Sequence, residues 1–290
     1  MKVEEVAESL AAALGGVEGL EHLDDGGQGL VWRFQEGGED LVVKVMKAEN
    51  DPRIEKEIAA LGSIDSPFVM KFSGSFEFEH RGKVLHAIKG EFVPGGTVQD
   101  KLVADGPPSS TEAFHFVHGA LLGIKAIHDH GRIHRDLKPQ NIALRDGDWA
   151  TPVVLDLGLV RNLDETSITI YPQLLGTLPF MAPEQLRQER AVKRTDVFGI
   201  GAVLFYAMTG THPFFDPVTD AEMSTDDLRL KMIERGDELG WPRWSNLPVA
   251  LDEDVAAFVG SLIAADAFER PSVEAALAEC ESLLRARGEA

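Results

Sequence analysis

The sequence predicts an α+β protein built from a small antiparallel sheet and a larger helical region. Between residues 17 and 93, short runs rich in β-branched and aromatic residues alternate with glycine-rich turns, which is typical of strands joined in hairpins. From Pro94 onward, apolar residues recur at helical spacing instead. We therefore expect an N-terminal extension over residues 1–16, a β part over 17–93 and a helical part over 94–290.

The N-terminal extension is predicted to be an amphipathic helix. Val3, Val6, Leu10 and Leu14 recur at helical spacing, and the pair 15–16 is two glycines, which typically end a helix. We expect a packing or capping helix.

The β part is predicted to form a five-stranded antiparallel sheet with one main helix. Residues 17–46 should form a three-strand meander, because glycine-rich turns interrupt them twice. Two further strands, 68–78 and 83–93, are joined by a polar turn at 80–82. The helix is expected between residues 51 and 64.

The helical part carries its own start and stop signals. Ser109 and Glu112 form a capping box ahead of a long helix that Gly131 should end. The apolar helix predicted from Thr195 to Gly210 is too short to cross a bilayer. Further helices are expected near residues 225–235, 251–264 and 273–285, the last of them capped by Ser272.

Charge and cysteine content restrict the classes of partner. The formal net charge of −20 argues against binding nucleic acid or an anionic membrane surface. The single cysteine, Cys280, excludes an intramolecular disulfide and favours a reducing, cytoplasmic compartment. It lies on the apolar face of the last helix, so we expect a core residue rather than a nucleophile.

One stretch concentrates the groups needed for phosphate chemistry. Residues 133–141 read Ile-His-Arg-Asp-Leu-Lys-Pro-Gln-Asn, and Asp156-Leu157-Gly158 follows the apolar run 152–155. This places a carboxylate, an amine and an amide on one short loop, with a second carboxylate at the end of a strand-like run. Such a set can hold Mg²⁺ against a polyphosphate while a hydroxyl is oriented for attack.

The stretch resembles the catalytic loop of the eukaryotic-type (Hanks-type) serine/threonine protein kinases. Asp156-Leu157-Gly158 is similar to the magnesium motif of that family, with leucine in place of phenylalanine. The resemblance implies the bilobal kinase fold, ATP as substrate and Mg²⁺, or Mn²⁺ in its place. It also implies that Asp136 accepts or orients the substrate hydroxyl proton, that Lys138 steadies the γ-phosphate, and that Asn141 and Asp156 hold the metal.

The β part supplies the nucleotide-binding residues that the resemblance implies. The turn before Val31 is similar to the kinase glycine-rich loop, with Gly26 and Gly29 in register and Asp24 in place of the first glycine. On its own, this turn would be an ordinary hairpin. Lys44 at the end of the third strand would bind the α- and β-phosphates, beside Val42.

The family pairs that lysine with a helix glutamate. Glu57 is the preferred candidate here and Glu55 the alternative, on a different helical face. The main chain of Glu91 and Val93 would recognise the adenine edge. Because residue 90 is glycine, we expect a roomy pocket that accepts bulky N6-substituted adenine analogues.

The segment over residues 156–184 resembles a kinase activation segment closed by Ala-Pro-Glu. Its Glu184 is predicted to form a buried ion pair with Arg270. Arg135 beside Asp136 suggests regulation by phosphorylation of this segment, with Ser167 or Thr169 as the favoured sites of autophosphorylation.

The function favoured by the sequence is a serine/threonine protein kinase acting on protein substrates. A nucleotide-binding pseudokinase scaffold and a small-molecule kinase are the alternatives. The spacing of His128, His130 and His134 could suggest zinc, but no acid or cysteine completes the shell. The chain ends soon after its last helix, so we expect little beyond a kinase domain.

Overall fold

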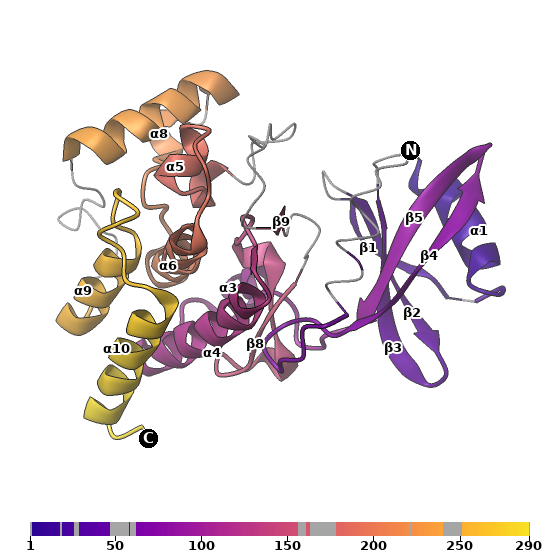
Figure 1. Ribbon diagram of the computed structural model, residues 1–290, viewed down its shortest axis with the longest axis horizontal. Helices are drawn as coiled ribbons and strands as arrows, with labels where there is room; N and C mark the ends of the chain where they lie inside the picture. The colour runs from indigo at the N-terminus through magenta and orange to yellow at the C-terminus, as the bar shows by residue number, and fades with distance from the viewer. Residues whose placement is uncertain are drawn as a thin grey trace. The chain divides into compact units, whose positions relative to one another are not determined.

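The chain divides into two units, Met1–Val93 and Pro94–Ala290, and each is described by itself (Figure 1). The computed structural model describes residues 2–17, 19–25, 29–46, 58, 62–155, 161–162, 178–220, 222–239 and 251–289.

The first unit contains the predicted five-stranded antiparallel sheet, in the order β1-β2-β3-β5-β4. The fourth strand begins at Phe72 rather than at residue 68, because the preceding residues form a turn in which the Val69 N–H donates to the Ser66 carbonyl at 3.2 Å. The fifth ends at Glu91. The strands are β1 (Glu21–Asp25), β2 (Gly29–Glu36), β3 (Glu39–Met46), β4 (Phe72–His80) and β5 (Lys83–Glu91).

Two hairpins close on two-residue turns whose backbone is left-handed. Gly37 and Gly38 have φ of 63° and 88° and join β2 to β3, while Arg81 and Gly82 have φ of 53° and 76° and join β4 to β5. Turns with positive φ at both central residues match the twist of the flanking strands, which is why glycine recurs here.

Helix α1 (Val3–Ala13) covers one face of this sheet, as the sequence predicted for a packing helix (Figure 1). Val6 and Leu10 are fully buried in a core cluster that includes Trp32 and Val43. Side chains alternate along a strand, so the residues between these core positions point to the opposite face. That second face carries the predicted nucleotide-binding side chains.

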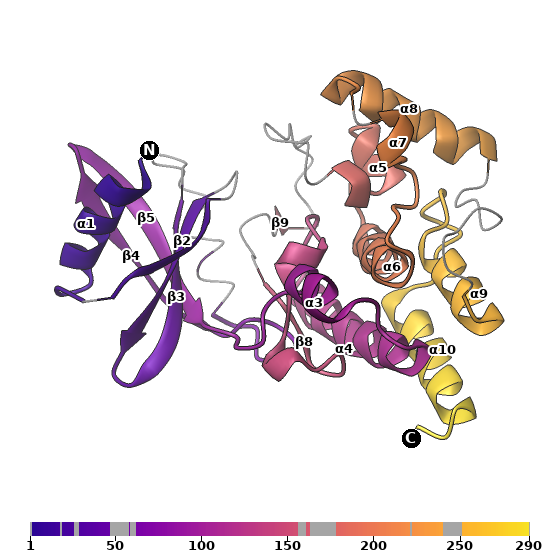
Figure 2. The same ribbon diagram turned by 180° about the vertical axis from the view of Figure 1, so that it is seen from behind.

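The second unit is mainly helical, with α4 (Ser110–Asp129) and α6 (Lys193–Thr209) packed together at its centre (Figures 1 and 2). Helix α10 (Val273–Ala286) lies along α4, and α9 (Glu253–Leu262) lies along α6. The remaining described α-helices and strand pairs are α3 (Val98–Asp105), α5 (Pro183–Leu186), α7 (Pro217–Asp220), α8 (Thr225–Leu239), the ladder of β6 (Arg132–Ile133) with β9 (Arg161–Asn162) and the ladder of β7 (Ile142–Leu144) with β8 (Pro152–Val154).

The predicted capping signals are confirmed. The Ser109 hydroxyl accepts from the Glu112 N–H at 3.3 Å, and the Glu112 carboxylate accepts from the Ser109 N–H at 2.8 Å. Thr97 and Asp100 form the same box at the start of α3, which the sequence analysis missed although its spacing is local. None of the helices in the described part of the chain is long and apolar enough to cross a membrane.

Cys280 is a core residue, as predicted. Its thiol is fully buried on α10 and donates to the Phe114 carbonyl at 3.3 Å. Burial raises the pKa of this thiol to about 12, which suppresses the reactive thiolate.

Candidate active site

The backbone of the predicted catalytic loop is held by a buried carboxylate. Asp196 on α6 is 1% exposed and accepts hydrogen bonds from the N–H groups of His134 and Arg135, both at 2.8 Å. His128 Nε2 donates to the same carboxylate at 2.8 Å. Burial raises the pKa of Asp196, but the bond from His128 and the other donors outweigh it and lower the pKa below its usual value. Asp196 therefore fixes the backbone of this loop.

Arg135 takes up a left-handed backbone conformation, with φ of 70°. This conformation is costly for a non-glycine residue and persists where neighbouring groups fix it. Both of its peptide groups are fixed: Asp196 binds the N–H, and Gln185 Nε2 donates to the carbonyl at 2.9 Å. Gln185 was missed from the sequence, although it directly follows Ala-Pro-Glu.

His134 connects the loop to the strand that precedes Asp156. The ring is fully buried, and its Nδ1 accepts from the Asp136 N–H at 3.2 Å. Nε2 must therefore carry the hydrogen, which it donates to the Leu155 carbonyl at 2.8 Å. His134 is therefore a buried residue that holds the loop against this strand.

The other two histidines of the considered zinc site have separate roles. His128 binds Asp196, and His130 donates to the Ala126 carbonyl at 2.8 Å. Within the described ranges, no group of three or more histidine, cysteine or acidic side chains could hold a metal ion.

The groups expected to do chemistry meet at one carboxylate. Asp136 is 4% exposed, and its Oδ2 accepts from Asn141 Nδ2 at 3.0 Å and lies 3.3 Å from Lys138 Nζ. Asn141 Nδ2 also donates to the Asp136 carbonyl at 2.7 Å. Since the amide nitrogen is used in these bonds, the amide oxygen of Asn141 is the atom that could bind Mg²⁺, which prefers oxygen ligands.

In the first unit, the strand register places three predicted nucleotide-binding residues and Gly90 on one face of the sheet. Val31 pairs with Lys44, and Val42 pairs with Gly90, on the face opposite α1. The backbone at Gly29 lies close to the aliphatic part of the Lys44 side chain. A Cβ at residue 29 would be only 3.1 Å from Lys44 Cε. It would also lie 2.6 Å from the Val45 carbonyl oxygen, so only glycine fits.

Several predicted residues lie outside the described part of the chain. These are Gly26 of the glycine-rich turn, Glu57 and its alternative Glu55, Asp156, and the phosphorylation candidates Ser167 and Thr169.

The predicted adenine-binding segment is tied to its neighbours by its main chain. The Glu91 N–H donates to the Lys71 carbonyl at 2.9 Å, and the Glu91 carboxylate accepts from the Lys71 N–H at 3.0 Å. The Phe92 N–H donates to the Asp40 carbonyl at 3.1 Å, and Val93 is 6% exposed. The segment is therefore positioned by the sheet.

The space directly beside Gly90, which the sequence suggested would be empty, is occupied by Met70. A Cβ on Gly90 would lie 2.8 Å from Met70 Cε and 3.1 Å from Met70 Sδ. The sequence shows only that residue 90 lacks a side chain, whereas the residue that occupies this space comes from another segment.

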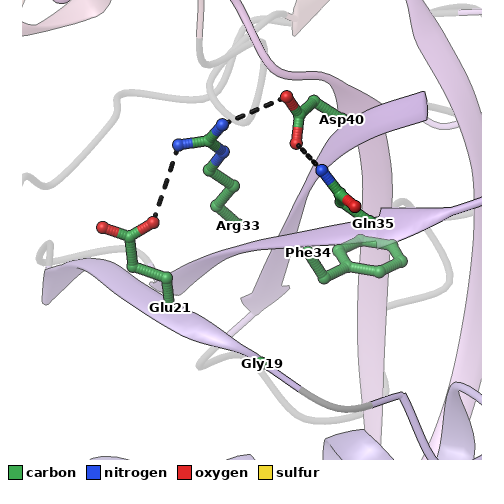
Figure 3. Close-up of a pocket in the computed structure, with 6 residues that line it drawn as sticks. All are labelled: Gly19, Glu21, Arg33, Phe34, Gln35 and Asp40. Carbon is green, nitrogen blue, oxygen red and sulfur yellow. Dashed lines mark hydrogen bonds and ion pairs between the residues drawn. The ribbon is translucent and has the colours of Figure 1, made fainter. Parts of the chain in front are cut away.

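A pocket of about 300 Å³ lies at the edge of the sheet (Figure 3). In it Arg33 lies between two carboxylates, 3.0 Å from Asp40 and 3.7 Å from Glu21. The Arg33 hydrogen bond holds the pKa of Asp40 below its usual value. Arg33 also stacks 4.1 Å above the centre of the Phe92 ring. None of the predicted site residues lines this pocket, and its Arg33 instead contacts Phe92 in the segment that follows β5.

The predicted ion pair between Glu184 and Arg270 is confirmed. Two parallel bonds of 2.8 and 2.9 Å join the guanidinium to the carboxylate, and Thr195 Oγ1 donates to Glu184 at 2.7 Å. Burial raises the pKa of Glu184, but the bonds and charge of Arg270 more than offset this and keep the pKa below its usual value. The pair fixes the end of the activation segment.

An aromatic cluster lies beside that segment end. The His212 ring stacks on Tyr206 with centroids 4.7 Å apart and meets Phe180 edge-on at 4.8 Å. The residue as a whole is partly exposed, but its Nδ1 is buried and has no hydrogen-bond partner among the described residues. Burial lowers the pKa of His212 from 6.5 to about 4.

We expect His212 to make the protein sensitive to mild acid. In the unfolded chain the His212 ring is protonated below about pH 6.5, whereas in the folded protein it stays neutral until the pH falls to about 4. The free energy of unfolding should therefore be undiminished above pH 6.5 and fall by about 3 kcal/mol as the pH drops toward 4. Urea unfolding across this range should show a smaller fall for His212→Phe, with His130→Gln as control. Equal falls in the parent and His212→Phe would contradict the assignment.

Comparison with known proteins decides the family. Residues 18–280 match the family described as protein kinase domain. The chain belongs to the protein kinase family. The resemblance identified at residues 133–141 is thereby confirmed.

This kinase domain is similar to curated bacterial proteins named serine/threonine-protein kinase PknB. It is 33% identical over 183 residues to that of Mycolicibacterium smegmatis, covering 60% of this chain and 29% of that protein. It is 32% identical over 182 residues to that of Mycobacterium leprae, with the same coverage of 60% and 29%. The chain thus spans less than a third of the length of these relatives.

The kinase domain also resembles a solved structure, titled crystal structure of Rad53 1-466 in complex with AMP-PNP. The TM-score is 0.70 at 25% identity, covering 89% of this chain and 64% of that chain. The predicted α+β bilobal kinase fold is confirmed.

Proposed function

We propose that this kinase domain transfers the γ-phosphate of ATP to serine or threonine hydroxyls of proteins. The observation that carries the proposal is the nearly buried carboxylate of Asp136, held by Asn141 and Lys138. The names of the bacterial relatives and the AMP-PNP complex of Rad53 support it. The Lys138-Pro139 pair also follows the serine/threonine branch of the family rather than the tyrosine branch.

In this proposal the first unit binds the nucleotide. Lys44, aimed by Glu57, binds the α- and β-phosphates, and the backbone of the glycine-rich turn covers them. Gly29 has no room for a Cβ, which is consistent with a turn whose backbone comes close to the phosphates. The adenine ring would be held by the side chains of Val31 and Val42 and by the main chain of Glu91 and Val93, with Gly26 completing the turn above the phosphates.

The second unit orients the acceptor. Its hydroxyl oxygen bonds to the γ-phosphorus while the bond to the β–γ bridging oxygen breaks, and ADP leaves. Asp136 orients the hydroxyl and accepts its proton, and Lys138 offsets charge on the γ-phosphate. The Asn141 amide oxygen and Asp156 would provide oxygen ligands for Mg²⁺ or Mn²⁺, and the bound metal would neutralise phosphate charge.

The proposal is tested by incubating the protein with γ-labelled ATP, Mg²⁺ and a basic protein substrate, followed by phosphoamino acid analysis. We expect label on serine or threonine. Nucleotide binding without transfer would favour the pseudokinase alternative, and label found only on small metabolites would favour a small-molecule kinase.

The net charge of −20 continues to argue against nucleic acid as a partner. A cytoplasmic location stays a prediction from the single cysteine.

We further propose that the kinase modifies itself at Ser167 or Thr169. Arg135, next to Asp136, has the charge to bind a phosphate added to this segment. Mass spectrometry after incubation with ATP should find phosphate between residues 159 and 180, and the Asp136→Ala protein, the control, should show none. An active enzyme without phosphate in this range would rule the proposal out.

A further inference from the structure

The position of Gly90 places any side chain there on the nucleotide face of the sheet. Gly90 pairs with Val42 on one side and with Phe72 on the other. Paired residues of antiparallel strands point to the same face, so a Cβ at residue 90 would project beside Val42, on the same face as Lys44. In the proposed function this face holds the adenine, and residue 90 precedes the adenine-binding segment.

Another residue occupies the space that a side chain at residue 90 would take. Gly90 is buried, and a Cβ built on it would lie 2.8 Å from Met70 Cε, 3.1 Å from Met70 Sδ and 3.2 Å from the Lys71 carbonyl oxygen. Contacts under 3.0 Å require one partner to move. Met70 therefore lies over the glycine and fills the space in front of it.

Hydrogen bonds of the neighbouring residue hold Met70 close to Gly90. The Glu91 N–H donates to the Lys71 carbonyl at 2.9 Å, and the Lys71 N–H donates to the Glu91 carboxylate at 3.0 Å. These bonds hold the 70–71 segment alongside 90–91. The methionine backbone is thus fixed, while its unbranched thioether can change rotamer.

We propose that Met70 closes the adenine site at the position where residue 90 lacks a side chain, and so determines which N6-substituted nucleotides are accepted. This inference rests on the proposed function of Glu91 and Val93. Gly90 alone suggested that the pocket accepts bulky N6 substituents. With Met70 in place, the parent should discriminate against such substituents, and shortening Met70 should admit them.

The packing itself can be tested without any nucleotide. Gly90→Ala should lower the melting temperature modestly, because its Cβ meets the flexible end of the Met70 side chain, which has to move aside. In a Met70→Ala background the same change should lower the melting temperature less, since its main obstacle is gone. Equal losses in both backgrounds would show that Met70 does not fill this space and would overturn the proposal.

Nucleotide selectivity is tested with ATP and N6-benzyl ATP in parallel, as the ratio of their kcat/KM values. We expect this ratio to rise at least about tenfold in Met70→Ala, because a pocket discriminates by about that factor for a single methylene. In Met70→Val, which keeps part of the apolar volume if alanine folds poorly, the ratio should rise less, and in Met70→Leu, the matched control, it should resemble that of the parent.

The two possible failures are distinguishable. If neither the parent nor the variants use ATP, the proposed function fails. If all of them use ATP but the ratio is unchanged in Met70→Ala, or the parent already uses N6-benzyl ATP as well as ATP, the assignment of Met70 is wrong.

Discussion

Replacing Asp136 by alanine is expected to abolish measurable phosphate transfer while leaving ATP binding nearly unchanged. The carboxylate is the point at which Asn141 and Lys138 converge, and it is 4% exposed. Losing a positioned acid-base group typically costs about 10²–10⁴-fold in rate. The adenine and phosphate contacts proposed for the first unit do not involve Asp136, so affinity for ATP should survive.

Label transfer and calorimetric titration with ATP measure the two quantities separately. The matched control is Asp129→Ala, which removes an exposed carboxylate from the same unit and should keep full activity. A melting curve confirms that each variant is folded. Full transfer by folded Asp136→Ala would show that the loop has been assigned the wrong role.

Glu184→Ala is expected to destabilise the protein by about 3–5 kcal/mol, because it leaves a buried guanidinium without its carboxylate. Arg270 is 1% exposed. Besides Glu184, Arg270 donates to the carbonyl oxygens of Ala264, Arg194 and Ala265. These carbonyls satisfy hydrogen bonds but do not balance the charge.

Urea unfolding measures the loss, and two further variants separate charge from packing. Lys125→Ala breaks the Lys125–Asp129 pair, which at 2.6 Å is shorter but exposed, and should cost only about 0.3–0.5 kcal/mol. The double variant Glu184→Leu/Arg270→Met removes both charges and should lose less than the sum of its single changes. A Glu184→Ala protein as stable as the parent would contradict a structural role for the pair.

Local signals account for the parts of the fold that were predicted well. The capping box at Ser109 and the two-residue turns at Gly37 and Arg81 act over a few neighbouring residues, so their chemistry is readable along the chain. The pair of Glu184 with Arg270 was predictable for a different reason. It accompanies a motif of the kinase family, so the resemblance to that family predicted a contact between residues that lie far apart in the sequence.

The contacts that were missed depend on residues without a motif. His128 was considered only as a metal ligand, yet it supports Asp196. Gln185 holds the Arg135 carbonyl, and its only sequence signal is its place after Ala-Pro-Glu. The space beside Gly90 was judged from the residue itself, while the structure fills it from Met70.

The sequence by itself determined the family, the order of strands and helices, and the identities of the residues expected to handle phosphate. Tertiary structure alone decided that α1 covers one sheet face and that Met70 lies over Gly90. The physical reason is that caps, turns and motifs are set by chemistry along the chain. Which side chain fills a space depends on the close packing of segments that are distant in sequence.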